Sequence, residues 1–172
     1  HTKVRGYDME KKKANKRFKR GLVGVVMTLL GKGIRYAYKV DERVKAEIDS
    51  LGDNCTIKMT VAPVGPSLLF GKADGKIFSK RCDYDTPADI VMSFKGVEGA
   101  LLMFTGRMGL GEGYAQHRFT IKGDLYKVMA ITRIMSYVES EMFPKFITKK
   151  IMNPVPKRAV NMLRFYLGML FI

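Results

Sequence analysis

Cysteine and histidine are both scarce in this sequence. Cys55 and Cys82 are far apart and form no C-x-x-C pair, and neither histidine stands at metal-ligand spacing. Small secreted domains usually carry several cysteines that form a disulfide framework. We therefore expect reduced thiols, a cytoplasmic location, and neither a metal nor another cofactor.

Long apolar runs are missing as well. The apolar run Gly21–Gly31 is uncharged for only eleven residues, whereas a membrane-spanning helix needs about 20. Any contact with a membrane is therefore expected to be peripheral.

Acidic residues are few at the two ends of the chain, although the net charge is +15 overall. Nine Lys and Arg residues among the first twenty face only Asp8 and Glu10, and no Asp or Glu follows Glu141. Such an excess of positive charge attracts nucleic acid, anionic lipid or an acidic protein. Most runs of charged residues, however, only form a solvated surface. Because apolar stretches adjoin the basic ones, and no nucleic-acid-binding pattern is found, an anionic membrane is favoured over nucleic acid.

The rest of the composition is that of a folded domain. Hydrophobic residues make up 47% of the 172 residues and charged ones 27%, which suits one globular core. We divide the chain into a basic N-terminal extension (1–16), a central domain (17–143), and a basic and apolar C-terminal extension (144–172). The composition does not indicate an oligomeric state.

Helical spacing of apolar residues marks the first part of the central domain. After about Lys16, a helix is predicted with an apolar stripe at Leu22, Val25, Val26, Leu29 and Leu30. Asp41 is placed to cap a second helix that ends near Gly52.

The spacing then changes to the alternation of strands. Strands are predicted over residues 55–61, 67–72, 76–82, 88–94 and 115–122, the second and third joined by a tight turn at Asp74-Gly75. A short helix is predicted over residues 96–104, a glycine-rich loop over 106–113, and a long helix capped by Asp124 over 125–143. His117 is expected on the inner face of the last strand.

This order of elements resembles the sterol-carrier-protein-type-two family, over about Cys55–Val138. The resemblance lies in a strand that starts with Ala88-Asp89, a short apolar helix ending at Gly106, and a strand ending in Gly123-Asp124. His117 departs from it, because such proteins usually have a glycine there. The resemblance implies an α+β fold: a five-stranded, mostly antiparallel sheet with helices packed on one face, enclosing an apolar tunnel. Helical N- and C-terminal extensions would be added to this domain.

Large apolar residues predicted to face one another between sheet and helices are the candidate ligand-binding residues. They are Met59, Phe70, Ile90, Met92, Phe94, Leu101, Leu102, Phe104, Phe119, Ile121, Val128, Met129 and Met135. Methionine adapts to ligands of varied shape, and the chain has 12. The same pattern is also that of an ordinary filled core.

The sequence gives little support for a catalytic or nucleotide-binding site. The glycine-rich stretch 106–113 runs from helix to strand and lacks the Lys-Ser/Thr ending of a phosphate loop, so we expect a gate at the tunnel mouth instead, with Arg107 meeting an anionic headgroup. His117 has no recognisable nucleophile or orienting partner. Asp83, Asp85 and Asp89 are explained by turns and a strand start more simply than by a metal.

The sequence therefore predicts a non-enzymatic protein. It would bind and transfer or present a lipid-like ligand (fatty acid, acyl-CoA, isoprenoid, or sterol or hopanoid type) and dock on anionic membrane. The alternative is an accessory interaction protein with a filled core, which docks on a partner enzyme through the apolar tail 160–172.

Overall fold

The computed structural model describes residues 2–63, 65–104, 106–145, 149 and 157–172. Most of the C-terminal extension before residue 157 therefore lies outside the described residues. The helices are α1 (Thr2–Val40), α2 (Glu42–Ser50), α3 (Val97–Phe104), α4 (Leu110–Ala115), α5 (Leu125–Met142) and α7 (Met162–Leu170). The strands are β1 (Thr56–Val61), β2 (Ser67–Ala73), β3 (Lys76–Cys82), β4 (Ile90–Phe94) and β5 (Phe119–Lys122).

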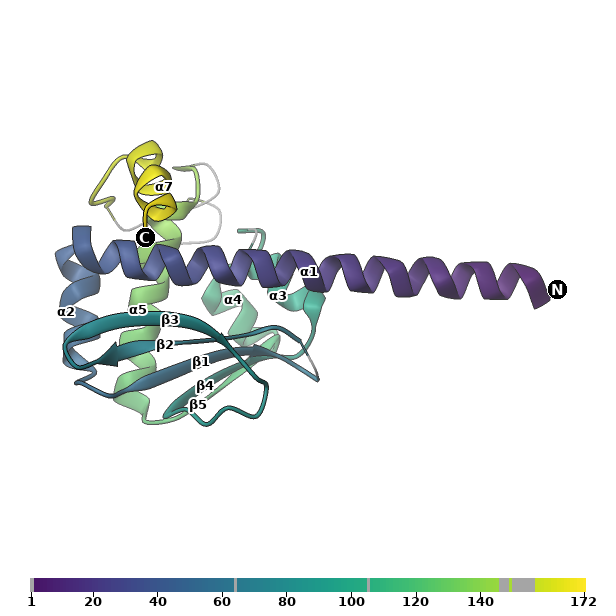
Figure 1. Cartoon of the computed structure of the whole chain (residues 1–172), viewed down its shortest axis with the longest axis horizontal. Coiled ribbons are helices and arrows are strands. Elements are labelled where there is room, and N and C mark those ends of the chain that lie inside the picture. Colours follow the sequence, from purple (N-terminus) through teal and green to yellow (C-terminus); the bar gives the residue numbers. More distant parts are fainter. Residues whose placement is uncertain (1, 64, 105, 146–148, 150–156) are drawn as a thin grey trace.

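The strands form one five-stranded sheet in the order β3-β2-β1-β4-β5. The β1–β4 pair is parallel, and the other three pairs are antiparallel. The prediction of a mostly antiparallel sheet in an α+β fold is thus confirmed. Figure 1 shows the helices gathered on one face of this sheet, with α1 continuing well beyond its edge toward the N-terminus.

Local chemistry explains where the strands turn and pair. Asp74 and Gly75 both have positive φ angles, 51° and 70°, as the tight β2–β3 turn requires. The Asp89 carboxylate accepts hydrogen bonds from the Thr56 backbone N–H and hydroxyl, each 2.8 Å long, and so sets the start of the parallel pair. Gly123 has a φ of 141° and packs against Ile90 and the Asp89 carbonyl, so the glycine before the Asp124 cap is needed there.

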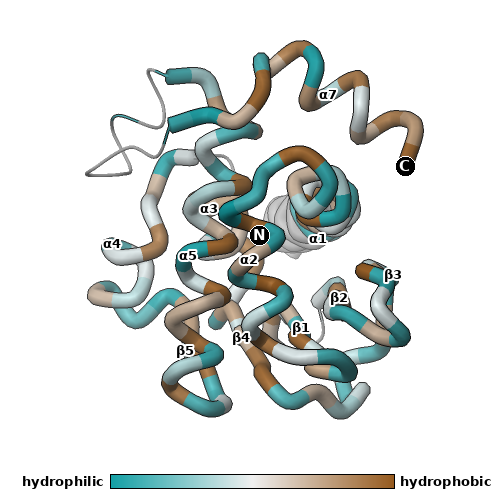
Figure 2. Tube along the Cα trace, turned by 90° about the vertical axis from the view of Figure 1, so that its left-hand side faces the viewer, coloured by the Kyte–Doolittle hydropathy of each residue, from teal (hydrophilic) through white to brown (hydrophobic). Residues whose placement is uncertain are grey.

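Helix α1 lies between the sheet and α7, as the end-on view in Figure 2 shows. Its buried residues are Val23, Met27, Leu30, Ile34 and Ala37. Leu22, Val25 and Leu29, placed in the apolar stripe by the sequence pattern, are instead exposed by 36–55%. The predicted stripe was wrong for these three, because α1 turns a different row of side chains toward the sheet.

Three further predictions need correction. Helix α1 begins at Thr2, earlier than the start expected after about Lys16, while the domain boundary at residue 16 stays a prediction. The glycine-rich stretch is not wholly a loop, since α4 occupies part of it and Gly113 packs tightly against Met103 and Phe119. His117 is exposed, with a φ of 52°, in the turn before β5; β5 begins only at Phe119, so the inward position predicted for His117 was wrong.

The outer face of the central strand is more covered than the alternation predicts. Lys58 and Thr60 of β1 are 7% and 3% exposed. The Lys58 ammonium donates to the carbonyl oxygens of Tyr84 and Thr86 at 2.7 and 2.6 Å, so the segment after β3 closes over this face. No helix of the described residues is long and apolar enough to cross a membrane.

Candidate functional site

The predicted ligand-binding residues do not share one environment. Eight are buried in the core between the sheet and the helices: Met59, Phe70, Ile90, Met92, Phe94, Phe104, Phe119 and Met135. Leu101, Leu102, Ile121 and Val128 are half-buried against that core. Met129 is 54% exposed, because it lies on the side of α5 that the sheet and α1 leave uncovered.

Two cavities at this core, lined by described residues, are small. One cavity lined by Ile57 and Phe70 and another lined by Phe104 and Met135 each have a volume of about 10 Å³. That is the size of a single water, whereas ligand pockets usually measure about 300–1,000 Å³. Neither cavity could hold such a ligand, and the apolar tunnel stays a prediction.

A larger apolar space lies outside the core, where α1 and α7 face each other beside β3. This α1–α7 groove has a volume of about 490 Å³. It is lined by Val25, Thr28, Leu29, Lys32, Arg81, Tyr166, Met169 and Leu170. The apolar pattern of the sequence did not predict this groove, because it placed Val25 and Leu29 in the stripe that packs on the domain. A second row of apolar residues on α1 could have indicated it.

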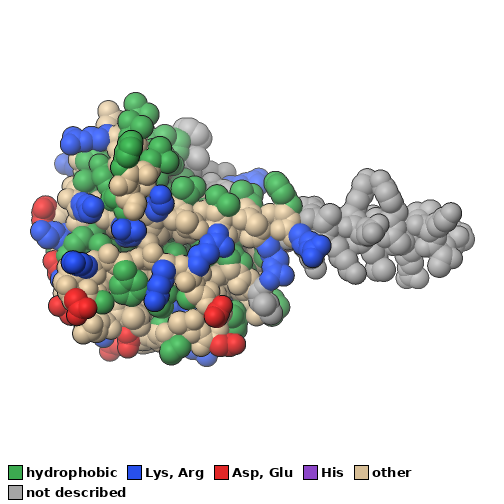
Figure 3. All heavy atoms as spheres, in the orientation of Figure 1, with side chains coloured by type: hydrophobic (Ala, Val, Ile, Leu, Met, Phe, Trp, Pro, Cys, Tyr) green, Lys and Arg blue, Asp and Glu red, His purple; other side chains and the backbone are tan. Residues whose placement is uncertain are grey.

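Two rows of exposed apolar side chains meet at this groove. On α1 they are Phe18, Leu22, Val25 and Leu29, spaced as one face of a helix. On α7 they are Leu163, Tyr166, Leu167 and Leu170, followed by Phe171, which is 89% exposed. Figure 3 shows apolar side chains with Lys and Arg around them over this part of the surface.

Helix α7 is held in position by Phe165 and by the hydroxyl of Tyr166. Phe165 is fully buried, with its ring edge-on to Tyr36 at a centroid distance of 5.3 Å. The Tyr166 hydroxyl donates to the Met142 carbonyl oxygen at 2.7 Å. Phe165 is therefore not available for contact with lipid, whereas Leu167 and Phe171, 50% and 89% exposed, are.

A second open space, the basic cleft, has a volume of about 740 Å³. It lies where β1 and β4 end, under α1 and beside the start of α3. Its lining residues are Lys19, Arg20, Ala62, Pro63, Gly65, Lys95, Gly96, Val97, Glu98, Gly99, Gln116, His117 and Arg118. Arg107, suggested by the sequence as a headgroup ligand, is exposed but does not line it.

Buried carboxyl groups lie at the end of α5. Burial raises the pKa of Glu139 to about 8. Burial also raises the pKa of Glu141, although hydrogen bonds from the Ala159 and Val160 backbone oppose the shift. Across the part of the chain that the structure describes, no three His, Cys, Asp or Glu side chains gather as a metal site.

Comparison with known proteins gives matches among solved structures. No protein-family model matches the chain, and neither does any curated protein. Sterol carrier protein 2 from Yarrowia lipolytica, in its apo form, is 16% identical, with 65% of this chain and 88% of that chain covered and a TM-score of 0.45. A UbiJ-SCP2 ubiquinone synthesis protein is 14% identical, with 71% and 99% covered and a TM-score of 0.47.

The chain is similar to sterol-carrier-type domains. Another such match is palmitated SCP2L2 from Aedes aegypti, 15% identical, with 57% of this chain and 92% of that chain covered and a TM-score of 0.38. This is the same family that the sequence resembles. At these identities, the function of the chain is inferred from its own residues.

Proposed function

We propose that this protein binds a lipid-like ligand without transforming it, and docks on anionic membranes through the α1–α7 groove. The ligand would be of the fatty acid, acyl-CoA, isoprenoid, or sterol or hopanoid type. The observation that carries this proposal is the band of exposed apolar side chains that runs across α1 and α7 with basic neighbours.

Charge and hydrophobicity act together on this band. Lys32 and Arg81 line the groove, and none of its lining residues is acidic. Residues 11–40 and 142–172, which contain most of α1 and all of α7, hold no Asp or Glu. Each basic residue near an anionic surface contributes about 1 kcal/mol, and apolar side chains that enter the lipid add to this.

The groove also suits an apolar ligand better than the two small core cavities do. Its volume of about 490 Å³ falls in the usual range for ligand pockets, and it opens beside the surface that would meet the membrane. An acyl or isoprenoid chain would lie along Val25, Leu29 and Leu170. The buried residues predicted from the sequence would contact it only if the helices moved away from the sheet.

Vesicle co-sedimentation tests the membrane step. Wild-type protein is expected to bind phosphatidylcholine vesicles that contain phosphatidylglycerol, and to bind pure phosphatidylcholine vesicles much less. Leu170→Glu, at a groove residue 67% exposed, should reduce binding at least about tenfold by placing a charge in the apolar band. Leu125→Glu is the matched control, because Leu125 is 74% exposed at the start of α5, away from the groove. Equal binding by all three proteins would refute the docking surface.

Lipid extraction and native mass spectrometry of the purified protein test the ligand. A bound apolar molecule that Leu170→Glu loses and Leu125→Glu retains is the expected result. Finding no such molecule, together with no displacement of a fluorescent fatty acid, would refute ligand binding.

A second candidate function is favoured by the small volume of the two core cavities, about 10 Å³ each. If side chains occupy the interior, the protein would act as an accessory interaction protein, and the apolar tail 160–172 would dock on a partner enzyme. The exposed residues Leu163, Leu167 and Phe171 would then contact that partner. This function would be favoured if the wild-type protein bound neither lipid nor vesicles in the tests above. It should then co-purify with a partner protein that the Leu170→Glu variant no longer retains.

A further inference from the structure

The basic cleft is formed by segments that are far apart in the sequence. Lys19 and Arg20 come from α1, Lys95 follows β4, and Arg118 precedes β5. The Lys95 backbone N–H donates to the Arg118 carbonyl oxygen at 2.9 Å, which fixes the two strand ends side by side. Folding therefore places four cations around one cleft.

The carboxylates nearby balance only part of this charge. Among the lining residues, Lys19, Arg20, Lys95 and Arg118 are basic and Glu98 is acidic, which leaves three positive charges in excess (four minus one). Glu98 itself pairs with Lys19, whose ammonium lies 3.0 Å from the carboxylate. Within the described part of the chain, Arg20 and Lys95 make no side-chain hydrogen bond or ion pair.

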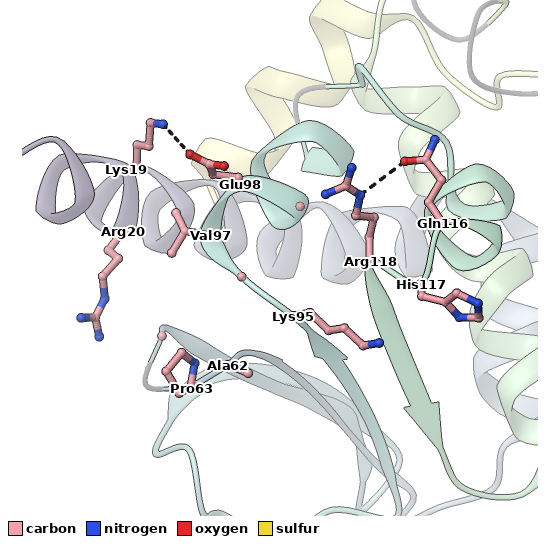
Figure 4. Close-up of a pocket in the computed structure, with 13 residues that line it drawn as sticks. Lys19, Arg20, Ala62, Pro63, Lys95, Val97, Glu98, Gln116, His117 and Arg118 are labelled. Carbon is pink, nitrogen blue, oxygen red and sulfur yellow. Dashed lines mark hydrogen bonds and ion pairs between the residues drawn. The ribbon is translucent and has the colours of Figure 1, made fainter. Parts of the chain in front are cut away.

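The close-up in Figure 4 shows how these side chains lie. Arg20 extends from α1 toward the loop that holds Pro63, across the open space of the cleft. Arg118 points toward Gln116, whose side-chain oxygen accepts from the Arg118 Nε at 3.3 Å. Arg118 is thus held by a long hydrogen bond to an uncharged acceptor, which an anion can replace.

We propose that the basic cleft binds the phosphate group of a phosphorylated ligand, with Arg20, Lys95 and Arg118 as the main cationic contacts. Several cations around one concave site, with a single carboxylate among the lining residues, favour a multivalent anion, and guanidinium groups match phosphate oxygens in geometry. This site goes beyond the proposed lipid and membrane function, since none of its residues lines the α1–α7 groove.

The size of the cleft indicates more than an inorganic ion. Its volume of about 740 Å³ lies within the range for small organic ligands. Ala62, Pro63 and Val97 give the same space an apolar side. A phosphate or diphosphate on an organic body therefore fits, and that body is either a lipid or a soluble molecule such as a nucleotide.

Titration calorimetry at constant ionic strength tests this site with three probes: pyrophosphate, adenosine diphosphate, and dihexanoyl phosphatidic acid below its micelle concentration. Sodium sulfate at the same ionic strength is the anion control. The variant Arg20→Gln/Lys95→Gln is expected to weaken binding of the phosphate probes at least about tenfold, because it removes two charge-assisted contacts. The matched control is Lys45→Gln/Lys76→Gln, which removes the same net charge at two exposed lysines outside the cleft and should bind as wild type does.

The probes also separate the two sources of the phosphate. Tighter binding of phosphatidic acid than of pyrophosphate assigns the site to a lipid headgroup, whereas tighter binding of adenosine diphosphate assigns it to a soluble ligand. Either result supports the phosphate site. No binding of any phosphate probe beyond that of sulfate, or equal weakening in both double variants, would overturn it. Vesicle binding through Leu170 can succeed or fail independently of this result.

Discussion

Gly168 of α7 lies directly against the ring of Tyr36 on α1. A Cβ added at Gly168 would overlap the Tyr36 ring, so a glycine is required for the two helices to approach this closely. On the other side of the contact, Gly33 of α1 faces the sulfur of Met169, 3.3 Å from an added Cβ. Small residues on both helices therefore set how α7 docks, and with it the shape of the α1–α7 groove.

Replacing Gly168 by alanine is expected to displace α7. Overpacking of this kind typically costs about 1–3 kcal/mol, and α7 can relieve it by moving away from α1. Backbone amides of residues 162–170 should then exchange with deuterium at least about tenfold faster than in wild type.

Gly21→Ala is the matched control for this change. An added Cβ at Gly21 meets nothing within 4 Å, and Gly21 lies inside α1, so alanine should stabilise the protein by roughly 0.5–1 kcal/mol. Unchanged exchange of α7 in both variants would mean that the Gly168 contact does not hold the helix.

The sequence was sufficient to predict the parts of the fold that depend on local chemistry. Asp41 and Asp124 cap α2 and α5 as predicted, accepting from the backbone N–H groups of Arg43 and Lys127. The Asp74-Gly75 turn is also confirmed, because a turn with two positive φ angles accepts few residue types. These caps and this turn depend on residues that are neighbours in the sequence, so the sequence alone is enough to predict them.

Features set by distant contacts could not be predicted in this way. Helix α1 carries two apolar rows, and only the positions of the sheet and α7 decide which row is buried. The basic cleft joins Arg20 to Lys95 and Arg118, which are far apart in the sequence, so no single stretch of sequence reveals it. His117 fits a strand by alternation, but the end of α4 and its φ of 52° turn it outward.

The two methionines of α5 that were both assigned to the ligand site should now behave differently. Met135 is 2% exposed and Met129 is 54% exposed. Met135→Ala is expected to lower the free energy of unfolding by about 2–5 kcal/mol, because it leaves a cavity in a filled core. Met129→Ala should change it by less than about 0.5 kcal/mol. Urea denaturation of both variants measures the difference. Equal, small losses would show that the core around Met135 is not tightly packed and would favour an interior ligand site.

Loss of the Asp41 cap should weaken the α1–α2 corner. Asp41 is 2% exposed and accepts from the Arg43 backbone N–H at 2.9 Å and from the guanidinium at 3.0 and 2.7 Å. Burial alone would raise the pKa of Asp41, but the Arg43 hydrogen bonds outweigh it and hold the pKa below the usual range. Asp41→Ala should therefore cost about 1–2 kcal/mol at neutral pH.

The same cap has a pH dependence of known sign. Because the folded-state pKa of Asp41 is depressed, its stabilisation is present above the unfolded-state pKa and is lost as pH falls through the folded-state pKa. The difference between wild type and Asp41→Ala should shrink in acid. Glu42→Ala, which alters an exposed neighbour, is the control, and a loss as large as that of Asp41→Ala would contradict the capping role.

Glu139 should make the protein less stable as pH rises toward 8. Its side chain is 7% exposed and lines a small cavity with Leu30, Phe104 and Met135, and burial raises its pKa from 4.5 to about 8. Between these two values the folded protein keeps a proton that the unfolded chain releases, so stability falls by up to about 1.4 kcal/mol per pH unit. The stabilisation is complete below the unfolded-state pKa and is lost as pH passes the folded-state pKa.

Glu139→Gln tests this assignment, because glutamine has the shape of the protonated side chain and does not titrate. Urea denaturation across this pH range should show a flatter dependence for the variant and greater stability than wild type above pH 8. The free energy of unfolding of the variant should still fall somewhat with rising pH, since burial raises the pKa of Glu141 as well. Glu42→Gln, at an exposed position, should keep the wild-type slope. If Glu139→Gln keeps the wild-type pH dependence of stability, another group titrates in this range and the assignment to Glu139 is wrong.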